Sequence, residues 1–216
     1  MAEIQLIHQR DQLLYPDVLF NRPISGLARL QVALFGAKSG HIYTLSQAYS
    51  TIAALGLSPV CVVEKKLSHD APMPVGSILM SVESKGKNQI AETADVLDYV
   101  DRANVAIVAP DIELSSALQL LFEHIFLQTS TPIIVTDELI PLYGFLSTVS
   151  RNRNNVLFCL TPAGLVELAG VLKLPIAIRP GRGIYNTLTI MDAIAGECRA
   201  HVVCMAEDML VVRDAA

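Results

Sequence analysis

Charged side chains are scarce in this sequence, and basic ones are in the minority. Asp, Glu, Lys and Arg together make up 17% of the 216 residues, and 16 basic residues face 21 acidic ones, for a net charge of -5. Nucleic acids and anionic membranes bind basic surfaces, so the composition argues against either as the main partner. Apolar residues make up 52%. So large a share predicts strands covered on both faces, or apolar surface that a homo-oligomer or a partner protein covers.

Long apolar runs and paired cysteines are also missing. No window approaches the roughly 18 apolar residues that suggest a membrane span, and residues 1–14 lack the apolar core of a signal peptide. The cysteines lie in or beside apolar runs without C-x-x-C spacing, which predicts buried, reduced thiols: Cys61, Cys159, Cys198 and Cys204. We therefore expect a cytoplasmic protein in which residues 1–216 form a single domain.

Short apolar runs alternate with longer amphipathic stretches along most of the chain. This alternation predicts strand–helix–strand units whose buried strands pair in parallel through right-handed crossovers. The expected fold class is α/β, a three-layer α/β/α sandwich with a mostly parallel sheet. Strands are expected at residues 31–35, 59–63, 104–108, 132–135, 155–160, 201–205 and 209–212. Helices are expected at 42–55, 114–127, 139–148, 162–172 and 188–198, and loops at 68–76, 150–155 and 179–183.

The loop after the first expected strand is rich in glycine and leads into a helix. Ligands of open parallel sheets bind beyond the carboxyl ends of the strands, and free amides at a helix N-terminus favour a phosphate. The candidates for nucleotide or substrate binding in this loop are Gly36, Lys38, Ser39, Gly40 and His41. An ordinary strand-to-helix turn accounts for the same residues. The loop is not a Walker A loop, because lysine would have to follow Gly36 directly.

Three later strand ends carry polar residues that are also candidates for nucleotide or substrate binding. Asp111 follows the third expected strand, Asp137 and Glu138 follow the fourth, and Thr161 follows the fifth. Carboxylates at a strand end can bind a ribose, a metal or a proton in transfer. Capping of the helix that follows explains Asp111, Asp137 and Thr161 equally well. Both interpretations stay open for each residue.

No metal-ligand set and no catalytic triad can be assembled from the sequence. The five histidines are scattered, and only His41 is placed at an expected strand end. No Ser-His-Asp or Cys-His arrangement has a specific spacing. The catalytic residues therefore stay unassigned, and we expect no metal.

In order along the chain, these segments resemble the ribokinase-like fold, and most closely the ADP- or ATP-dependent NAD(P)H-hydrate dehydratases. The first strand, the glycine loop and the helix that ends at Gly56 are similar to the opening of that family. Residues 104–110 resemble its strand that ends in Gly-Pro-Gly, and residues 132–139 resemble its strand that ends in Asp-Ala-Asp-Ala-Leu. Residues 160–162 resemble its Thr-Pro-His segment, and residues 190–210 resemble the helix and strand before its Lys-Gly pair. The resemblance covers roughly Gly26 to Val212.

Several positions depart from the family's pattern. The Gly-Pro-Gly becomes Ala109-Pro-Asp, which hinders close backbone approach to a ligand. The first aspartate of the strand motif falls on Val135, whereas the second is kept as Asp137. The histidine after Thr-Pro becomes Ala163, and the Lys-Gly pair falls on Ala206-Glu. The family's Gly-Thr-Gly-Asp turn, which makes the phosphate anion hole and carries the catalytic aspartate, has no counterpart here, and neither do its C-terminal helices.

The resemblance implies ADP or ATP, with NADH or NADPH, as ligands, and nucleotide-driven dehydration of hydrated NADH or NADPH as the reaction. That reaction needs a general base and an oxyanion site, and neither is identifiable. We therefore expect a degenerate, non-catalytic member that acts as an oligomeric scaffold or a weak nucleotide binder. Its missing C-terminal layer would expose apolar surface for a homo-oligomer or a partner protein. Two alternatives stay open: an active dehydratase completed by another chain, and an unrelated flavodoxin-like module that binds a small molecule.

Overall fold

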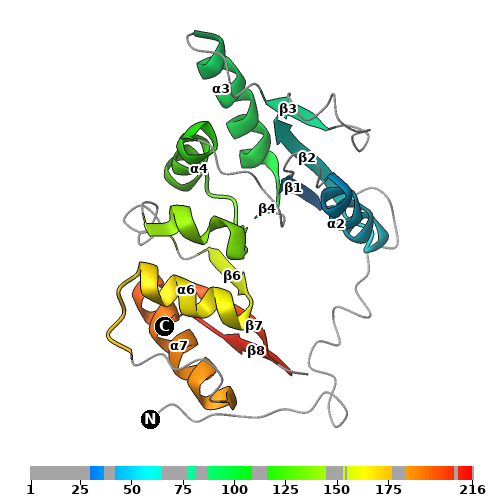
Figure 1. Ribbon diagram of the computed structural model, residues 1–216. Helices are drawn as coiled ribbons and strands as arrows, with labels where there is room; N and C mark the ends of the chain where they lie inside the picture. The colour runs from blue at the N-terminus through cyan, green and yellow to red at the C-terminus, as the bar shows by residue number, and fades with distance from the viewer. Residues whose placement is uncertain are drawn as a thin grey trace.

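The computed structural model describes most of the chain and shows a sheet flanked by helices (Figure 1). The expected α/β fold with a mostly parallel sheet is confirmed. The description covers residues 30–36, 42–64, 77–80, 87–108, 116–144, 153, 155–176, 183–206 and 209–215.

The described residues form one eight-stranded sheet, with strands β1 (Gln31–Phe35), β2 (Ser58–Glu64), β3 (Ile78–Met80), β4 (Val105–Val108), β5 (Ile133–Val135), β6 (Val156–Leu160), β7 (His201–Ala206) and β8 (Met209–Arg213). The strand order is β3-β2-β1-β4-β5-β6-β7-β8, and only β7 and β8 pair antiparallel. The order reverses between β1 and β4, the point at which open sheets bind ligands. Flavodoxin-like proteins have the order 2-1-3-4-5, so the sheet does not support that alternative.

The described helices divide unequally between the two faces of the sheet. They are α2 (Ile42–Ala54), α3 (Lys87–Arg102), α4 (Ser116–Gln128), the 3-10 helix η2 (Asp137–Leu139), α6 (Pro162–Val171) and α7 (Gly183–Cys198). The helices α3, α4, α6 and α7 lie on one face, whereas α2 lies on the other (Figure 1). Among the described helices, none has the length and the apolar run that a membrane crossing requires.

The larger core lies between the sheet and the four helices on its first face. Alternate strand residues point into this core, as in β6, where Val156, Phe158 and Leu160 are buried. Phe35 of β1 contacts Phe122 of α4, with ring centroids 5.4 Å apart. The apolar runs that predicted the strands thus form the inner face of the sheet, as burial of alternate side chains requires.

A smaller core lies under α2 on the second face. Leu34 and Cys61, from β1 and β2, pack there against Ile42 and Leu45 of α2. This cluster covers the second face only near β1 and β2, because α2 is the single described helix on that side. The three-layer arrangement is therefore complete over one part of the sheet.

Two helices end in the same hydrogen-bonded turn, with a backbone in the left-handed region. After α2, the N–H of Gly56 (φ 82°) donates to the carbonyl of Ala53 over 2.9 Å. After α6, the N–H of Lys173 (φ 53°) donates to the carbonyl of Gly170 over 3.0 Å. The helix end predicted at Gly56 is confirmed. Glycine adopts this backbone freely, but lysine pays a conformational cost for it.

Some elements differ from the sequence prediction. The helix α3 and the strand β3 had no prediction, because the segment 87–102 is mostly polar and β3 has three residues. The helix expected at 188–198 begins earlier, at Gly183. The helix expected at 139–148 starts as the turn η2 and is described to residue 144, since 145–150 lie outside the described residues.

A buried arginine ties the end of α4 to the start of β5. Arg153 lies in the predicted loop 150–155, yet it is 9% exposed. Its Nη1 donates to the carbonyls of Ile125 (2.9 Å) and Phe126 (3.2 Å), and its Nη2 donates to the carbonyl of Thr131 (2.7 Å). Burial lowers the pKa of Arg153. A positive charge at a helix C-terminus is stabilising, and here it also satisfies carbonyls that the helix leaves unpaired.

We predict that Arg153→Ala lowers the free energy of unfolding by about 3 kcal/mol, because it leaves several buried carbonyls without a donor. Urea unfolding followed by circular dichroism measures this change. The matched control is Arg102→Ala, which removes an exposed ion pair with Asp98 and should cost less than about 0.5 kcal/mol. Equal losses in the two variants would contradict the anchoring role of Arg153.

We also predict that Lys173→Gly raises the free energy of unfolding by about 1 kcal/mol, because glycine relieves the left-handed backbone at the end of α6. The converse change, Gly56→Ala, should lower it by about 1 kcal/mol for the same reason. Both variants are compared with the parent chain by thermal unfolding. A loss of stability in Lys173→Gly would show that its side chain contributes more than its backbone costs.

Candidate functional site

The carboxyl ends of β1, β5 and β6 hold the three described candidates: Gly36, Asp137 and Thr161. Gly36 is buried, and its N–H donates to the carbonyl of Val62 on β2 over 3.3 Å. The strand β4 separates β1 from β5, which puts about 10 Å between their ends. The structure thus brings two of the three candidates together. The other five lie outside the described residues: Lys38, Ser39, Gly40, His41 and Asp111.

Asp137 and Thr161 form a hydrogen-bonded pair across 24 residues of sequence. Oδ1 of Asp137 accepts from the backbone N–H of Thr161 over 3.0 Å, and Oδ2 accepts from its hydroxyl over 2.5 Å. The hydroxyl of Thr161 in turn accepts from the N–H of Gly164 over 3.1 Å. Both oxygens of the carboxylate therefore have donors from the chain itself. We call these three residues the strand-end latch.

The first turn of α6 is built to receive the carboxylate. Thr161 caps this helix and Pro162 occupies its first turn, as the sequence predicted. A Cβ atom at Gly164 would lie 2.1 Å from Oδ1 of Asp137, which is far inside contact distance. Glycine is thus required at this position for the approach of Asp137. A glycine in the first turn of a predicted helix was the sequence signal for that approach.

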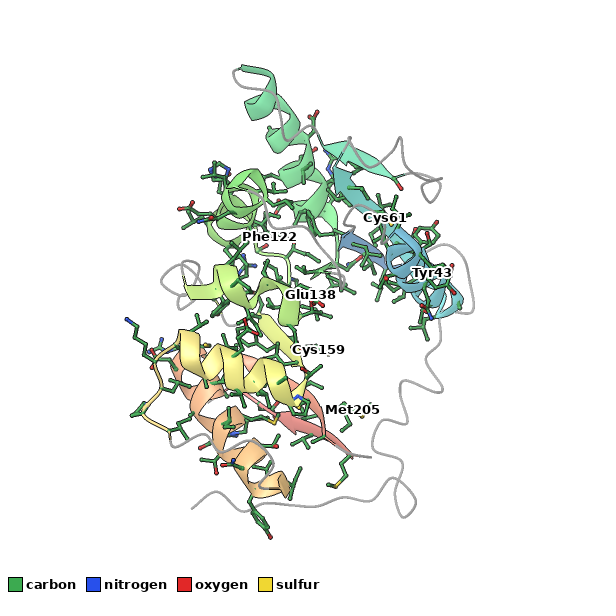
Figure 2. The ribbon with its side chains drawn as sticks, in the orientation of Figure 1. Tyr43, Cys61, Phe122, Glu138, Cys159 and Met205 are labelled. Atoms are coloured by element: carbon green, nitrogen blue, oxygen red, sulfur yellow. The ribbon has the colours of Figure 1, made fainter. Side chains whose placement is uncertain are left out.

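Of the two interpretations left open for Asp137, capping of its own helix is wrong. Thr136 is the N-cap of η2, and no side chain makes the capping hydrogen bond there. Asp137 instead reaches the neighbouring strand end, because β5 and β6 are adjacent in the sheet. The hydroxyl of Thr136 lies 2.8 Å from Oε2 of Glu138 and 3.0 Å from the carbonyl oxygen of Val108. Glu138, shown in Figure 2, therefore stays bound to its own strand end.

The electrostatics of the latch favour a structural role. A helix N-terminus attracts an anion, and in ligand-binding sheets that anion is a phosphate of the ligand. Here the protein places its own carboxylate, Asp137, against the first turn of α6. A phosphate approaching the same helix end would meet a negative charge. The arrangement stabilises the start of α6. The backbone N–H groups of Thr161 and Gly164 already donate within the latch, so neither is free to bind a phosphate.

The cysteines near this edge are poorly suited to nucleophilic chemistry. Burial, and secondarily the charge of Asp137, raises the pKa of both Cys159 and Cys204, the latter to about 11. Burial raises the pKa of Cys61 to about 12. All four thiols are free, as predicted, and three are buried. The burial expected for Cys159 is wrong, because its side chain points to the second face of the sheet, where none of the described helices covers it.

The described residues contain no group of three or more His, Cys, Asp and Glu side chains that could hold a metal ion. His201 lies at the start of β7, where its Nδ1 is 3.2 Å from Oδ1 of the exposed Asp214. His124 lies on α4, on the other side of the sheet. The two described histidines thus lie apart, as the sequence predicted.

No protein-family model matches the chain, and no curated protein matches its sequence. Solved structures do match its fold. A ribokinase-like superfamily protein from Enterococcus faecalis matches with a TM-score of 0.57 and 17% identity, over 86% of this chain and 60% of that protein. A hypothetical protein from Streptococcus mutans matches with a TM-score of 0.57 and 13% identity, over 92% of this chain and 68% of that protein.

The chain thus spans 60% of the length of the first of these structures. At such low identities the likeness establishes the fold and not the activity. The sheet order, the single antiparallel edge and these two structures lead to one conclusion: the chain has a ribokinase-like fold.

Proposed function

We propose that this chain is a degenerate, non-catalytic relative of the NAD(P)H-hydrate dehydratases that acts as a scaffold, with weak or no nucleotide binding. The observation that carries the proposal is the strand-end latch, in which both carboxylate oxygens of Asp137 accept hydrogen bonds from Thr161. By resemblance, Asp137 is the one aspartate of the family's strand motif that this chain keeps. Its carboxylate serves the fold.

The use of Asp137 in the latch argues against a role as general base. A general base has to direct an oxygen at the proton that it accepts, within hydrogen-bond reach of the substrate. Here the carboxylate is held between Thr161 and the backbone of Gly164. Turning it outward would leave the hydroxyl and the N–H of Thr161 without their acceptor, at a cost of about 1–3 kcal/mol.

The neighbouring positions support the same conclusion. Val135 stands where the family has its first aspartate, and its side chain is fully buried in the core. Ala163 stands where the family has a histidine, and it is exposed in the first turn of α6. Both substitutions remove a polar group from this edge of the sheet. At the described ends of β5 and β6, Thr161 still starts a helix, whereas the polar groups that the family has at these two positions are gone.

One observation favours a second candidate function, an active dehydratase whose site another chain completes. The second face of the sheet exposes large apolar side chains, among them Met205 and Leu210. An added layer of helices from a partner would cover them and bring further residues to the strand ends. This candidate requires adenine nucleotides to bind, whereas the scaffold does not.

A thermal-shift titration with ADP, ATP, NADH and NADPH distinguishes the two. A ligand at 100 times its Kd stabilises the native state by about 2.7 kcal/mol, which raises the Tm of a chain of this size by about 5–10 °C. We predict no concentration-dependent rise with any of the four ligands. Inorganic phosphate at equal ionic strength is the control. A saturable rise with an adenine nucleotide alone would overturn the proposal.

The latch itself makes a second prediction, tested by adding a methyl group at Gly164. In the parent chain, Gly164→Ala should lower the free energy of unfolding by about 2 kcal/mol, because the methyl group overlaps Asp137. In an Asp137→Ala background the same change should raise it by about 1 kcal/mol, as alanine usually does in a helix. Urea unfolding measures the four chains of this cycle.

The matched control for this cycle is Gly196→Ala in α7, where an added Cβ meets nothing within 4 Å. It should be stabilising by about 1 kcal/mol in both backgrounds. Additive effects of Gly164→Ala and Asp137→Ala would show that the two residues do not share a contact. That result would remove the structural account of Asp137 and return it to the candidates for catalysis.

A further inference from the structure

The imidazole of His201 lies at the start of β7, where two groups that follow β8 converge on one of its nitrogens. Nδ1 of His201 is 3.2 Å from Oδ1 of Asp214 and 3.3 Å from the backbone N of Ala215, whose N–H points at it. Asp214 and Ala215 directly follow β8, which ends at Arg213. They reach His201 because β7 and β8 pair antiparallel, with Val202 opposite Arg213. We call His201, Asp214 and Ala215 the β8 clasp.

The two partners of Nδ1 require opposite protonation states of that nitrogen. A ring nitrogen without a proton has one lone pair, which can accept from the N–H of Ala215. A ring nitrogen with a proton can only donate, and the ionised carboxylate of Asp214 can only accept. Nδ1 therefore serves one partner at a time, although both lie within reach.

The titratable groups around His201 come from every element that packs against β7. From the end of β8 the ring faces Asp214, whereas its neighbour on β6 is the apolar Leu157. The thiol of Cys159 lies two residues further along β6, and Arg199, which is exposed, precedes β7 by two residues. The titratable side chains of α6 and α7 belong to the opposite face of the sheet: Glu167, Tyr185, Asp192, Glu197 and Cys198. Among the described residues, Asp214 is thus the carboxylate that faces the ring.

The strand β8 is anchored on the first face of the sheet, just before the clasp. Nε of Arg213 donates to Oδ1 of Asp192 on α7 over 2.7 Å. Val202, opposite Arg213 in the register, is fully buried in the larger core. Histidine is the only side chain that ordinarily changes its charge between about pH 5 and 8. A change of pH in this range therefore acts on the clasp and leaves the anchor in place.

We propose that the β8 clasp is a pH-sensitive switch that sets the course of the chain after Arg213. While the ring is neutral, its proton is on Nε2, and Nδ1 accepts from the N–H of Ala215. Protonation of Nδ1 ends that hydrogen bond and creates a donor, which binds Oδ1 of Asp214. The proton comes from solvent, because the side chain of His201 is 43% exposed.

Each state satisfies the ring in its own way. In the neutral state the lone pair of Nδ1 meets a donor, and Asp214, whose side chain is 83% exposed, keeps its hydration. In the acidic state an imidazolium meets a carboxylate, and hydrogen bonds between charged groups are about twice as strong as neutral ones. The exposure of Asp214 limits this gain. We therefore expect a change of a few-fold in the population of the Ala215 contact, and no change in the rest of the fold.

The position of the clasp decides what the switch changes. His201 lies in the row of the second face that also contains Ile134 and Leu157. The end of this row carries the charge of Asp214 alone when the ring is neutral, and an ion pair when it is protonated. The switch therefore changes the charge at this rim of the second face and the course of the chain that leaves the edge strand β8.

This inference goes beyond the proposed function and does not depend on it. His201 is the first residue of β7, so the clasp lies at the amino end of that strand. The candidate site lies at the carboxyl ends of β1, β5 and β6, the opposite edge of the sheet. Nucleotide binding would refute the proposed function and leave the switch standing.

The experiment is NMR spectroscopy of the full, ¹⁵N-labelled chain between about pH 5 and 8, the range in which an imidazole titrates. The ¹⁵N shifts of the His201 ring show which nitrogen carries the proton, and hydrogen exchange reports on the N–H of Ala215. We expect the neutral ring to carry its proton on Nε2. The protection factor of Ala215 should fall about 5-fold in acid, as the loss of one ordinary hydrogen bond implies, and its midpoint should coincide with that of the ring.

Two variants separate the clasp from other effects of pH. His201→Gln removes the titrating ring, so the pH dependence at Ala215 should disappear. The matched control is His124→Gln on α4, in the opposite layer, which should leave that dependence unchanged. Circular dichroism checks that both variants are folded.

Three results would overturn the proposal. A neutral ring with its proton on Nδ1 would donate to Asp214 in both states and leave nothing to switch. Constant protection of Ala215 from about pH 5 to 8 would show that its N–H does not depend on the ring. A pH dependence that persists in His201→Gln would assign it to another group.

Discussion

A parallel sheet has to bury both of its faces, and this constraint accounts for most of the structure. On the first face the chain meets the constraint itself, because α3, α4, α6 and α7 cover the inward residues of the strands. On the second face α2 covers only the region of β1 and β2. The large core on the first face, the small core under α2 and the exposed apolar side chains of the second face, such as Met205 and Leu210, follow from this division.

The parts of the fold that depend on local patterns could be predicted from the sequence. Buried strands are short apolar runs, and Gly56 and Thr161 mark helix ends through their own backbone and hydroxyl groups. The helix α3 also has such a pattern, because Val96, Leu97 and Val100 lie at helical spacing and pack on the core, but the many polar residues around them led the prediction to miss it. Arg153 could not be recognised as buried, because the backbone carbonyls that it binds are 22 to 28 residues away in the sequence.

The sequence could predict where the candidate site residues lie, but not what they do. Parallel pairing of β5 with β6 brings their carboxyl ends together, which put Asp137 and Thr161 at one edge from the sequence alone. Whether Asp137 faces a ligand or the chain depends on the groups that its oxygens meet. The absence of a side chain at Gly164 lets the carboxylate settle against α6. The sequence signal for this contact is the glycine in the first turn of α6, which does not by itself identify Asp137 as its partner. A residue's chemistry follows from its neighbours in space.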